Sequence, residues 1–248
     1  MPSETTADQL VKAAKKLSTG LGQLEFRPPV SHVYNPLDYA WRAHEAYLRK
    51  YGDSRKRILM LGMNPGPFGM AQTSVPFGEI AAVRDWMGIE EPVGKPEPEH
   101  PKRPVDGFAC PKSEVSGRRL WGLFSEVFPD ARDFFAEHFI ANYCPLAFMS
   151  ETGANITPDK LPAAEMKPVA TACDEHLQAV VSILQPEWLL GIGGWAHKRL
   201  QALFDSDAFR IGTILHPSPA SPAANRGWAE AATKQLNDLG VWKGPETR

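Results

Sequence analysis

Long hydrophobic runs are missing from this sequence. It contains no stretch of about 18 consecutive apolar residues, so we expect no membrane-spanning helix. Charged residues such as Glu4, Asp8 and Lys12 interrupt the first 20 residues, which therefore lack the apolar core of a secretory signal peptide. The segment 1–20 is instead predicted to form an amphipathic N-terminal helix. We expect an intracellular protein, cytoplasmic if bacterial and nuclear if eukaryotic.

Cysteine is also scarce. The chain has three cysteines, an odd number, and their spacing fits no metal-binding knuckle: Cys110, Cys144 and Cys173. An iron–sulfur cluster held by four cysteines is excluded by the same count. Free thiols in a reducing compartment are the expectation. We therefore expect neither a metal nor another cofactor.

No excess of charge of either sign is present, because 27 basic residues face 29 acidic ones and the net charge is −2. A protein that depends on contacts to duplex phosphates is usually more basic, so composition argues mildly against nucleic acid. Basic residues do cluster at four places, 55–57, 102–103, 118–119 and 198–199. Each cluster alone is more often a solvated surface than a phosphate site.

What the sequence does contain is an alternation of strand and helix patterns. Short apolar runs predict buried strands at 58–61, 139–141, 188–190 and 213–215. Helical periodicity predicts helices at 38–51, 79–87, 120–128, 166–184 and 225–239. This alternation favours an α/β fold with a mainly parallel sheet flanked by helices. The Pro- and charge-rich stretch 90–111 is predicted to be an irregular excursion from one domain spanning 1–248, because the pattern continues on both sides.

The least ordinary residues follow the predicted strands. Parallel strands end at the same edge of a sheet, where α/β proteins bind ligands. The loop 62–70 reads Gly-Met-Asn-Pro-Gly-Pro-Phe-Gly-Met, and the loop 216–219 reads His-Pro-Ser-Pro. Convergence at this edge would bring together four residues distant in sequence: Asn64, Phe77, Asn142 and His216. Each of them alone has an ordinary explanation, as a turn cap, a core ring, a loop tie or a structural histidine.

Taken together, these strings resemble the single-strand-selective monofunctional uracil-DNA glycosylase family. The similarity covers most of the chain beyond the first helical turns and includes 75–79, 100–104, 114–117, 142–146 and 155–158. It implies the uracil-DNA glycosylase fold, with a central, mainly parallel four-stranded sheet. The implied reaction is hydrolysis of the N-glycosidic bond of uracil in single- and double-stranded DNA, within base excision repair. No lysine occupies the motif positions, so no strand-cleaving lyase step is implied.

The resemblance also implies roles for individual residues. Asn64 would position the attacking water, and His216 would donate a hydrogen bond to the base oxygen on which negative charge develops. Phe77 would stack on the flipped base, and Asn142 would bind its Watson–Crick edge. Three further positions would close the pocket wall: Met63, Gly66 and Phe68. Gly66 would leave space beside the pyrimidine C5, so that 5-substituted uracils fit.

DNA is the partner that the resemblance implies. The segment 152–166 and the loop 218–226 would face the duplex, the loop acting as a wedge in the gap left by the flipped base. The residues expected to contact DNA are Ser116, Arg118, Gly153, Asn155, Lys160, Ser218, Pro219, Ala220, Ser221 and Arg226. The chain departs from the family at Ala220, where vertebrate members carry arginine, and this predicts weaker engagement of paired duplex than of single strands. A monomer without an obligate protein partner is expected.

Several alternatives stay open at this point. The same pocket wall would admit a deaminated purine, hypoxanthine or xanthine, and a free nucleoside is a further possible substrate. A non-catalytic module for damaged or single-stranded DNA is the alternative from another class, although binding alone requires neither Asn64 nor His216. The segment 191–196, Gly-Ile-Gly-Gly-Trp-Ala, formally fits a dinucleotide-binding fingerprint. No acidic residue ends the next predicted strand, so a close-packed strand-to-helix turn is the preferred interpretation.

Overall fold

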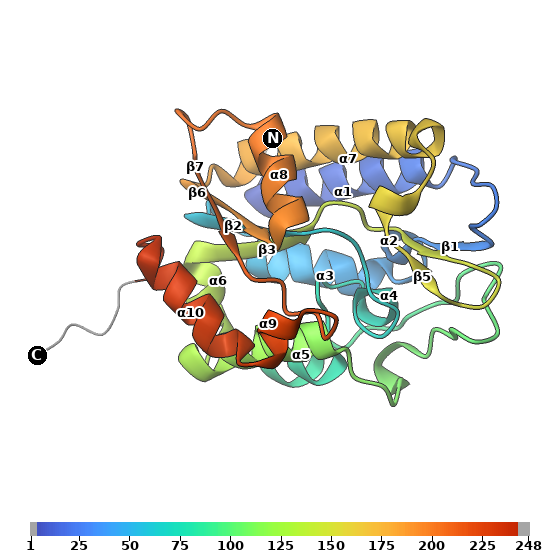
Figure 1. Cartoon of the computed structure of the whole chain (residues 1–248), viewed down its shortest axis with the longest axis horizontal. Helices are drawn as coiled ribbons and strands as arrows, with labels where there is room; N and C mark the ends of the chain where they lie inside the picture. Colours follow the sequence, from blue (N-terminus) through green and yellow to red (C-terminus); the bar gives the residue numbers. More distant parts are fainter. Residues whose placement is uncertain (1–3, 243–248) are drawn as a thin grey trace, which may run out of the picture.

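The computed structural model describes residues 4–242, and its centre is a four-stranded sheet in the order β3-β2-β6-β7 (Figure 1). The strands are β2 (Ile58–Gly62), β3 (His138–Asn142), β6 (Trp188–Ile192) and β7 (Arg210–Ile214). Each neighbouring pair is parallel. Every residue of β2 and β6 is buried, as in central strands covered on both faces. The predicted α/β class with a parallel four-stranded sheet is confirmed.

The strand order places a topological switch point at the carboxyl end of β2. Of the four strands in this sheet, β2 comes first along the chain, and it pairs with β3 on one side and with β6 on the other. Loops that leave adjacent strands in different directions open a crevice at such a switch point. The loop 63–69 after β2 and the turn at Gly193 after β6 both begin there.

Helices flank the sheet. α1 (Thr6–Leu21) and α7 (Ala163–Leu184) lie side by side at the top of Figure 1, while α5 (Val115–Val127) and α10 (Trp228–Asp238) contact each other below. The others of more than one turn are α3 (Trp41–Tyr51), α6 (Ala131–Glu137) and α8 (Gly194–Leu203). α1 begins with a capping box between Thr5 and Asp8 and buries a stripe at helical spacing that includes Leu10, Ala14 and Leu17. Within residues 4–242, no helix is both long and apolar enough to cross a lipid bilayer.

Three predicted helices differ from the prediction in detail, two by subdivision and one by helix type. The segment 38–51 contains the end of α2 (Pro36–Tyr39) and all of α3, because Asn35 caps a new helix and the chain leaves helical geometry at Ala40. The segment 79–87 widens into a π-helical turn, η1 (Ala82–Trp86). The segment 225–239 is divided between α9 (Pro222–Asn225) and α10, because Gly227 between them has a φ of 142°.

A second, small sheet was not predicted. It is antiparallel, in the order β1-β4-β5, and consists of β1 (His32–Tyr34), β4 (Ala147–Met149) and β5 (Asn155–Ile156). Strands of two or three residues are too short to show an alternating pattern. The stretch 90–111 is irregular apart from η2 (Gly107–Ala109) and lies against this sheet, where the Tyr34 hydroxyl donates to the Arg103 carbonyl at 2.8 Å. Two further short helices are α4 (Met70–Thr73) and η3 (Pro158–Lys160).

Candidate active site

Three of the expected site residues meet at the carboxyl edge of the sheet. Asn142 ends β3 directly opposite Gly62, the last residue of β2. A Cβ atom on Gly62 would overlap the Asn142 amide and lie 2.5 Å from the Phe77 ring, so only glycine lets both side chains approach. The ring centroids of Phe77 and His216 are 5.9 Å apart. The structure therefore brings Phe77, Asn142 and His216 together around one small volume.

The Phe77 ring is fixed by its own backbone. Phe77 has a φ of 53°, which is unusual for a bulky residue, and its side chain is buried. Its carbonyl accepts hydrogen bonds from the Trp121 indole at 3.0 Å and from the Glu79 amide at 2.7 Å. A side chain at Gly117 would overlap this carbonyl, so the start of α5 packs directly on it. These contacts fix the position of the Phe77 ring, as stacking on a ligand would require.

The side-chain amide of Asn142 is only half satisfied. Its Nδ2 donates to the Met70 sulfur at 3.1 Å. Its Oδ1 is buried and has no hydrogen-bond partner among residues 4–242. A buried acceptor without a partner costs about 1–3 kcal/mol. The arrangement therefore suits a ligand that brings an N–H group beside Phe77.

His216 is held as a neutral ring. The backbone N–H of Ser218 donates to its Nδ1 at 3.1 Å, which places the proton of the neutral imidazole on Nε2. Burial lowers the pKa of His216 from its usual value of 6.5, so the ring is uncharged at neutral pH. The Nε2–H group is then available as a hydrogen-bond donor.

Close packing accounts for the glycines after β6. A Cβ atom on Gly193, whose φ is 94°, would lie 2.9 Å from the His216 Cβ. One on Gly191 would overlap the backbone of His197 at the start of α8. These glycines allow a tight strand-to-helix turn beside His216. This agrees with the interpretation that we preferred to a dinucleotide-binding site.

The loop after β2 carries the remaining expected pocket residues. Asn64 is partly exposed two residues beyond β2, and its side chain makes only a 3.4 Å contact with the Pro65 carbonyl among the described residues. It is therefore free to hold a water molecule. The Phe68 ring lies under two cations, with Arg103 Cζ at 5.5 Å and Lys112 Nζ at 4.8 Å from its centroid. Met63, which begins this loop, is partly exposed.

The carboxyl group of Glu114 packs against Gly66 and Gly69. A Cβ atom on Gly66 would lie 2.5 Å from Oε2 of Glu114, and one on Gly69 would overlap the same carboxyl. The two glycines admit this carboxyl against the loop that carries Asn64. Burial and the neighbouring Glu79 raise the pKa of Glu114 to about 7.

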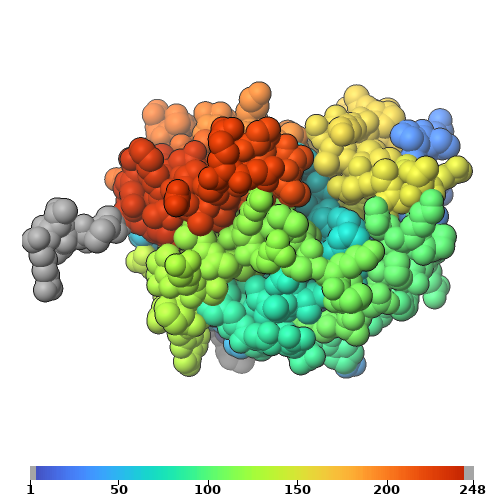
Figure 2. Space-filling view, turned by 60° about the horizontal axis from the view of Figure 1, so that its bottom comes forward, coloured from blue at the N-terminus to red at the C-terminus, as the bar shows by residue number. Residues whose placement is uncertain are grey.

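The loop that carries His216 is anchored to α5. Arg119 donates to the Pro217 carbonyl at 3.1 Å and to the Asn225 side-chain oxygen at 2.9 Å. Asn225 in turn donates to the Pro219 carbonyl at 2.8 Å. Beyond these anchors, Pro219 and Ala220 form an exposed tip, and the partly exposed Ser218 and Ser221 flank it. In Figure 2, the cyan segment after β2 reaches the surface where this red segment meets the green and yellow ones.

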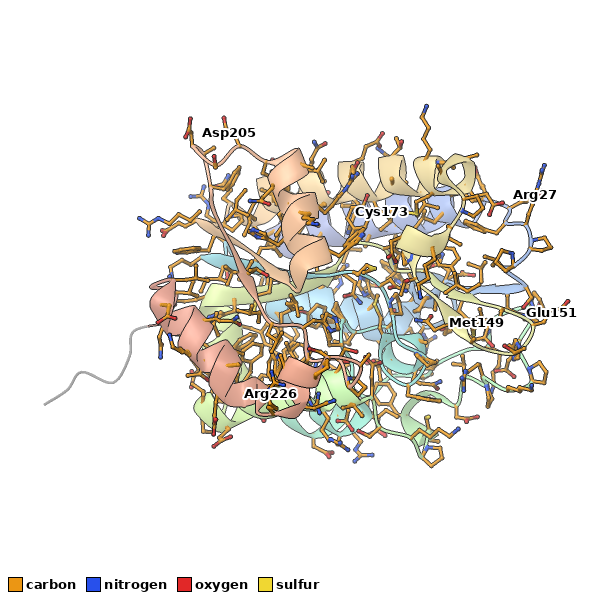
Figure 3. All side chains as sticks on the ribbon, in the orientation of Figure 1. Arg27, Met149, Glu151, Cys173, Asp205 and Arg226 are labelled. Carbon is orange, nitrogen blue, oxygen red and sulfur yellow. The ribbon has the colours of Figure 1, made fainter. Side chains whose placement is uncertain are left out.

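The other expected DNA contacts are dispersed, and one of them, Gly153, is buried. Ser116 and Arg118 lie in the first turn of α5, and Arg226 follows α9 on the same side of the molecule (Figure 3). Asn155 in β5 and Lys160 in η3 are exposed. Gly153 is buried in the turn before β5, where its carbonyl accepts from Arg103 Nε at 2.8 Å.

Sequence reasoning missed three residues that the structure places at the site: Arg103, Glu114 and Arg119. The two glycines at positions 66 and 69 signalled that something packs closely on their loop, but not what. Nothing in the sequence distinguishes Arg119 from the adjacent Arg118. No group of three or more His, Cys, Asp or Glu within residues 4–242 is arranged to hold a metal ion.

The fold and the site together define a class of protein. The sequence pattern of the uracil DNA glycosylase superfamily matches residues 49–239. A crystal structure of wild-type SMUG2 from Pedobacter heparinus superposes with a TM-score of 0.68 at 18% identity, over 96% of this chain and 98% of that one, and shares the fold.

Closer relatives narrow the assignment. The single-strand selective monofunctional uracil DNA glycosylase of Mus musculus is 43% identical over 241 residues, 96% of this chain and 86% of that protein. The Bos taurus protein of the same name is 44% identical over 95% of this chain and 87% of its own length. The chain belongs to the single-strand selective monofunctional uracil-DNA glycosylase family.

Proposed function

We infer that this chain is a uracil-DNA glycosylase of base excision repair, a hydrolase that acts on DNA. The observation that carries the assignment beyond the family name is the unpartnered Oδ1 of Asn142 beside Phe77 and His216. A uracil stacked on Phe77 would donate N3–H to this oxygen, while Nδ2 would donate to O4. Cytosine has no proton at N3, so it would leave the buried oxygen unpaired and be rejected.

Cleavage of the N-glycosidic bond sends the bonding electron pair into the base and leaves positive charge on the sugar. The Nε2–H of neutral His216 would stabilise the negative charge on O2 of the departing base, a contribution of roughly 10²–10³ in rate. Asn64 would orient the water whose oxygen bonds to C1′. An amide accepts no proton at useful pH, so the path is dissociative and the water releases its proton after attack.

The target base must leave the helix to reach this pocket. The exposed tip at Pro219 and Ala220 lies on the loop that carries His216, so it can fill the gap while the histidine engages the base. Arg118, Lys160 and Arg226 supply exposed positive charge for backbone phosphates. We propose a monomer with one catalytic domain, active inside the cell without a cofactor, and a monofunctional reaction on single and double strands.

An excision assay tests this function. Labelled single-stranded oligonucleotides carrying one uracil are incubated with wild type, His216→Ala and Asn64→Ala, and products are separated before and after alkali. We expect an abasic product that breaks only after alkali, and rates at least about 10²-fold lower in both variants. Binding of the same oligonucleotides without release of uracil would overturn the function. Cleavage of free deoxyuridine at a comparable rate would indicate a nucleoside hydrolase.

A further inference from the structure

The side-chain amide of Asn142 can present two opposite hydrogen-bonding patterns to a base, and only one of them fits uracil. With Oδ1 toward N3 and Nδ2 toward O4, the amide accepts from N3–H and donates to the carbonyl, as the proposed function requires. Rotated by half a turn about its Cβ–Cγ bond, the same amide donates to N3 and accepts from an amino group on C4, which is the pattern of cytosine. Rejection of cytosine therefore depends on what prevents this rotation.

The sulfur of Met70 distinguishes the two orientations. The Nδ2 of Asn142 donates to Met70 Sδ at 3.1 Å. Its Oδ1 lies beside Gly62 and the Phe77 ring, because a Cβ atom on Gly62 would overlap both. A thioether sulfur accepts hydrogen bonds but has no proton to donate. Half a turn of the amide would therefore place Oδ1 against the sulfur lone pairs, where it gains no hydrogen bond.

Met70 is held in place by the short helix that it begins. Every residue of α4 is buried, Met70 included. The Tyr39 hydroxyl donates to the Ala71 carbonyl at 2.6 Å, and the Thr73 hydroxyl donates to the Gly78 carbonyl at 3.0 Å. Contacts to two other segments thus fix α4 at both of its ends. The sulfur consequently meets the amide from a fixed position.

The sulfur does not compete with the base for Asn142. A primary amide carries two protons on Nδ2, so one can stay on the Met70 sulfur while the other is donated to O4 of uracil. The pocket then needs no rearrangement when the base arrives, which is the advantage of a preorganised site. We propose, on the basis of the function inferred above, that Met70 is a positioning residue that fixes the orientation of the Asn142 amide and thereby excludes cytosine.

Loss of the sulfur should affect the two bases in opposite directions. Without an acceptor at Met70, the two orientations of the amide become similar in energy, so the wrong one meets uracil about half of the time, which costs no more than a few-fold. For cytosine, the rotated amide makes two hydrogen bonds where a buried oxygen was unpaired, and hydrogen-bonding sites of this kind discriminate by large factors. A merely structural role of Met70 would lower both rates together.

The test is Met70→Leu, which keeps the apolar volume and removes the acceptor. Met87→Leu is the matched control, because Met87 is just as buried and follows η1, outside the proposed pocket. Single-turnover excision is measured on single-stranded oligonucleotides that carry either one uracil or one cytosine at the same position and are otherwise free of both bases. The abasic product is cleaved with alkali and quantified for each variant.

We expect Met70→Leu to lower uracil excision by no more than about threefold. Cytosine excision should rise at least about tenfold above the wild-type rate or, where wild type releases no cytosine, above the detection limit. Met87→Leu should keep both rates within about twofold of wild type. A Met70→Leu variant that excises uracil but releases no more cytosine than wild type overturns the proposal and leaves the glycosylase function intact. Absence of uracil release by wild type overturns the function instead.

Nuclear magnetic resonance on the wild-type protein decides the matter if Met70→Leu does not fold. With methionine methyl groups and asparagine side chains labelled, an Nδ2 proton of Asn142 should show a nuclear Overhauser effect to the Met70 methyl group. The signals that disappear in Asn142→Ala identify this amide. A resolved Asn142 amide without that effect would overturn the proposal.

Discussion

Asn142 and Phe77, which line the proposed base pocket, are held by buried contacts, whereas Pro219 and Ala220 at the tip of the His216 loop are exposed. On the pocket side, Asn142 and the Phe77 ring pack against Gly62, and the Phe77 carbonyl packs against Gly117. A Cβ atom at either glycine would overlap these groups. The tip is secured at its base by side-chain hydrogen bonds from Arg119 and Asn225. The proposed base-binding side is therefore the more rigid of the two, and the exposed tip is the side that we expect to adjust to strands of different shape. Three changes probe this contrast.

Acidification should have the largest effect, because it acts on the pocket through His216. Burial lowers the pKa of this ring below 6.5, so it is neutral above that pH and takes up a proton only below it. Protonation at Nδ1 removes the acceptor of the Ser218 N–H. The N–H groups of Ser218 and of the imidazolium then face each other, and their hydrogen bond is replaced by repulsion. Single-turnover excision of uracil should fall by up to about tenfold per pH unit below the pKa.

The control for acidification is His216→Ala, whose residual rate should not follow this acid limb. Circular dichroism at each pH restricts the comparison to folded protein, because burial also lowers the pKa of His44 and His138 to about 4. A rate that rises on acidification would mean that the histidine acts as a cation.

The same contrast explains what could be predicted from the sequence. The four strands are predictable because apolar runs mark them. The segments that carry Asn64, Phe77, Asn142 and His216 are predictable because long motif strings mark them. The packing of Glu114 is not, because it depends on a contact across about 50 residues with two glycines that could have served any turn. Arg119 differs from Arg118 only in which way it faces on α5, and helix orientation follows from packing rather than from the local sequence.

Removal of the Arg119 anchors should have an intermediate effect. Arg119→Ala eliminates two hydrogen bonds to the loop that carries His216, so the histidine loses its fixed position. We expect kcat on single-stranded uracil substrates to fall about tenfold, equivalent to about 1.4 kcal/mol of barrier. Single-turnover and steady-state kinetics separate this from a loss of binding.

The adjacent, exposed Arg118 provides the matched control for Arg119. Arg118→Ala should weaken binding, lower the salt dependence of KM by about one counterion, and leave kcat unchanged. If Arg119→Ala and Arg118→Ala change KM equally and leave kcat unchanged, the loop that carries His216 does not need the Arg119 hydrogen bonds. The contrast between a fixed pocket and an adjustable tip would then not hold for this loop.

The smallest effect is expected at the exposed tip, where Ala220 offers one methyl group to the gap left by a flipped base. A single strand leaves no paired partner to displace, so it needs little wedge, whereas duplex requires a few kcal/mol of unstacking. Ala220→Arg should therefore raise the ratio of duplex to single-strand excision by a few-fold, while the single-strand rate stays within about twofold.

Ala229→Arg adds the same charge on the exposed side of α10 and separates general attraction to DNA from wedging. If both arginines raise the ratio equally, charge alone accounts for it. If neither does, the tip takes no part in opening the duplex, and the adjustable side of the site must lie elsewhere on the surface.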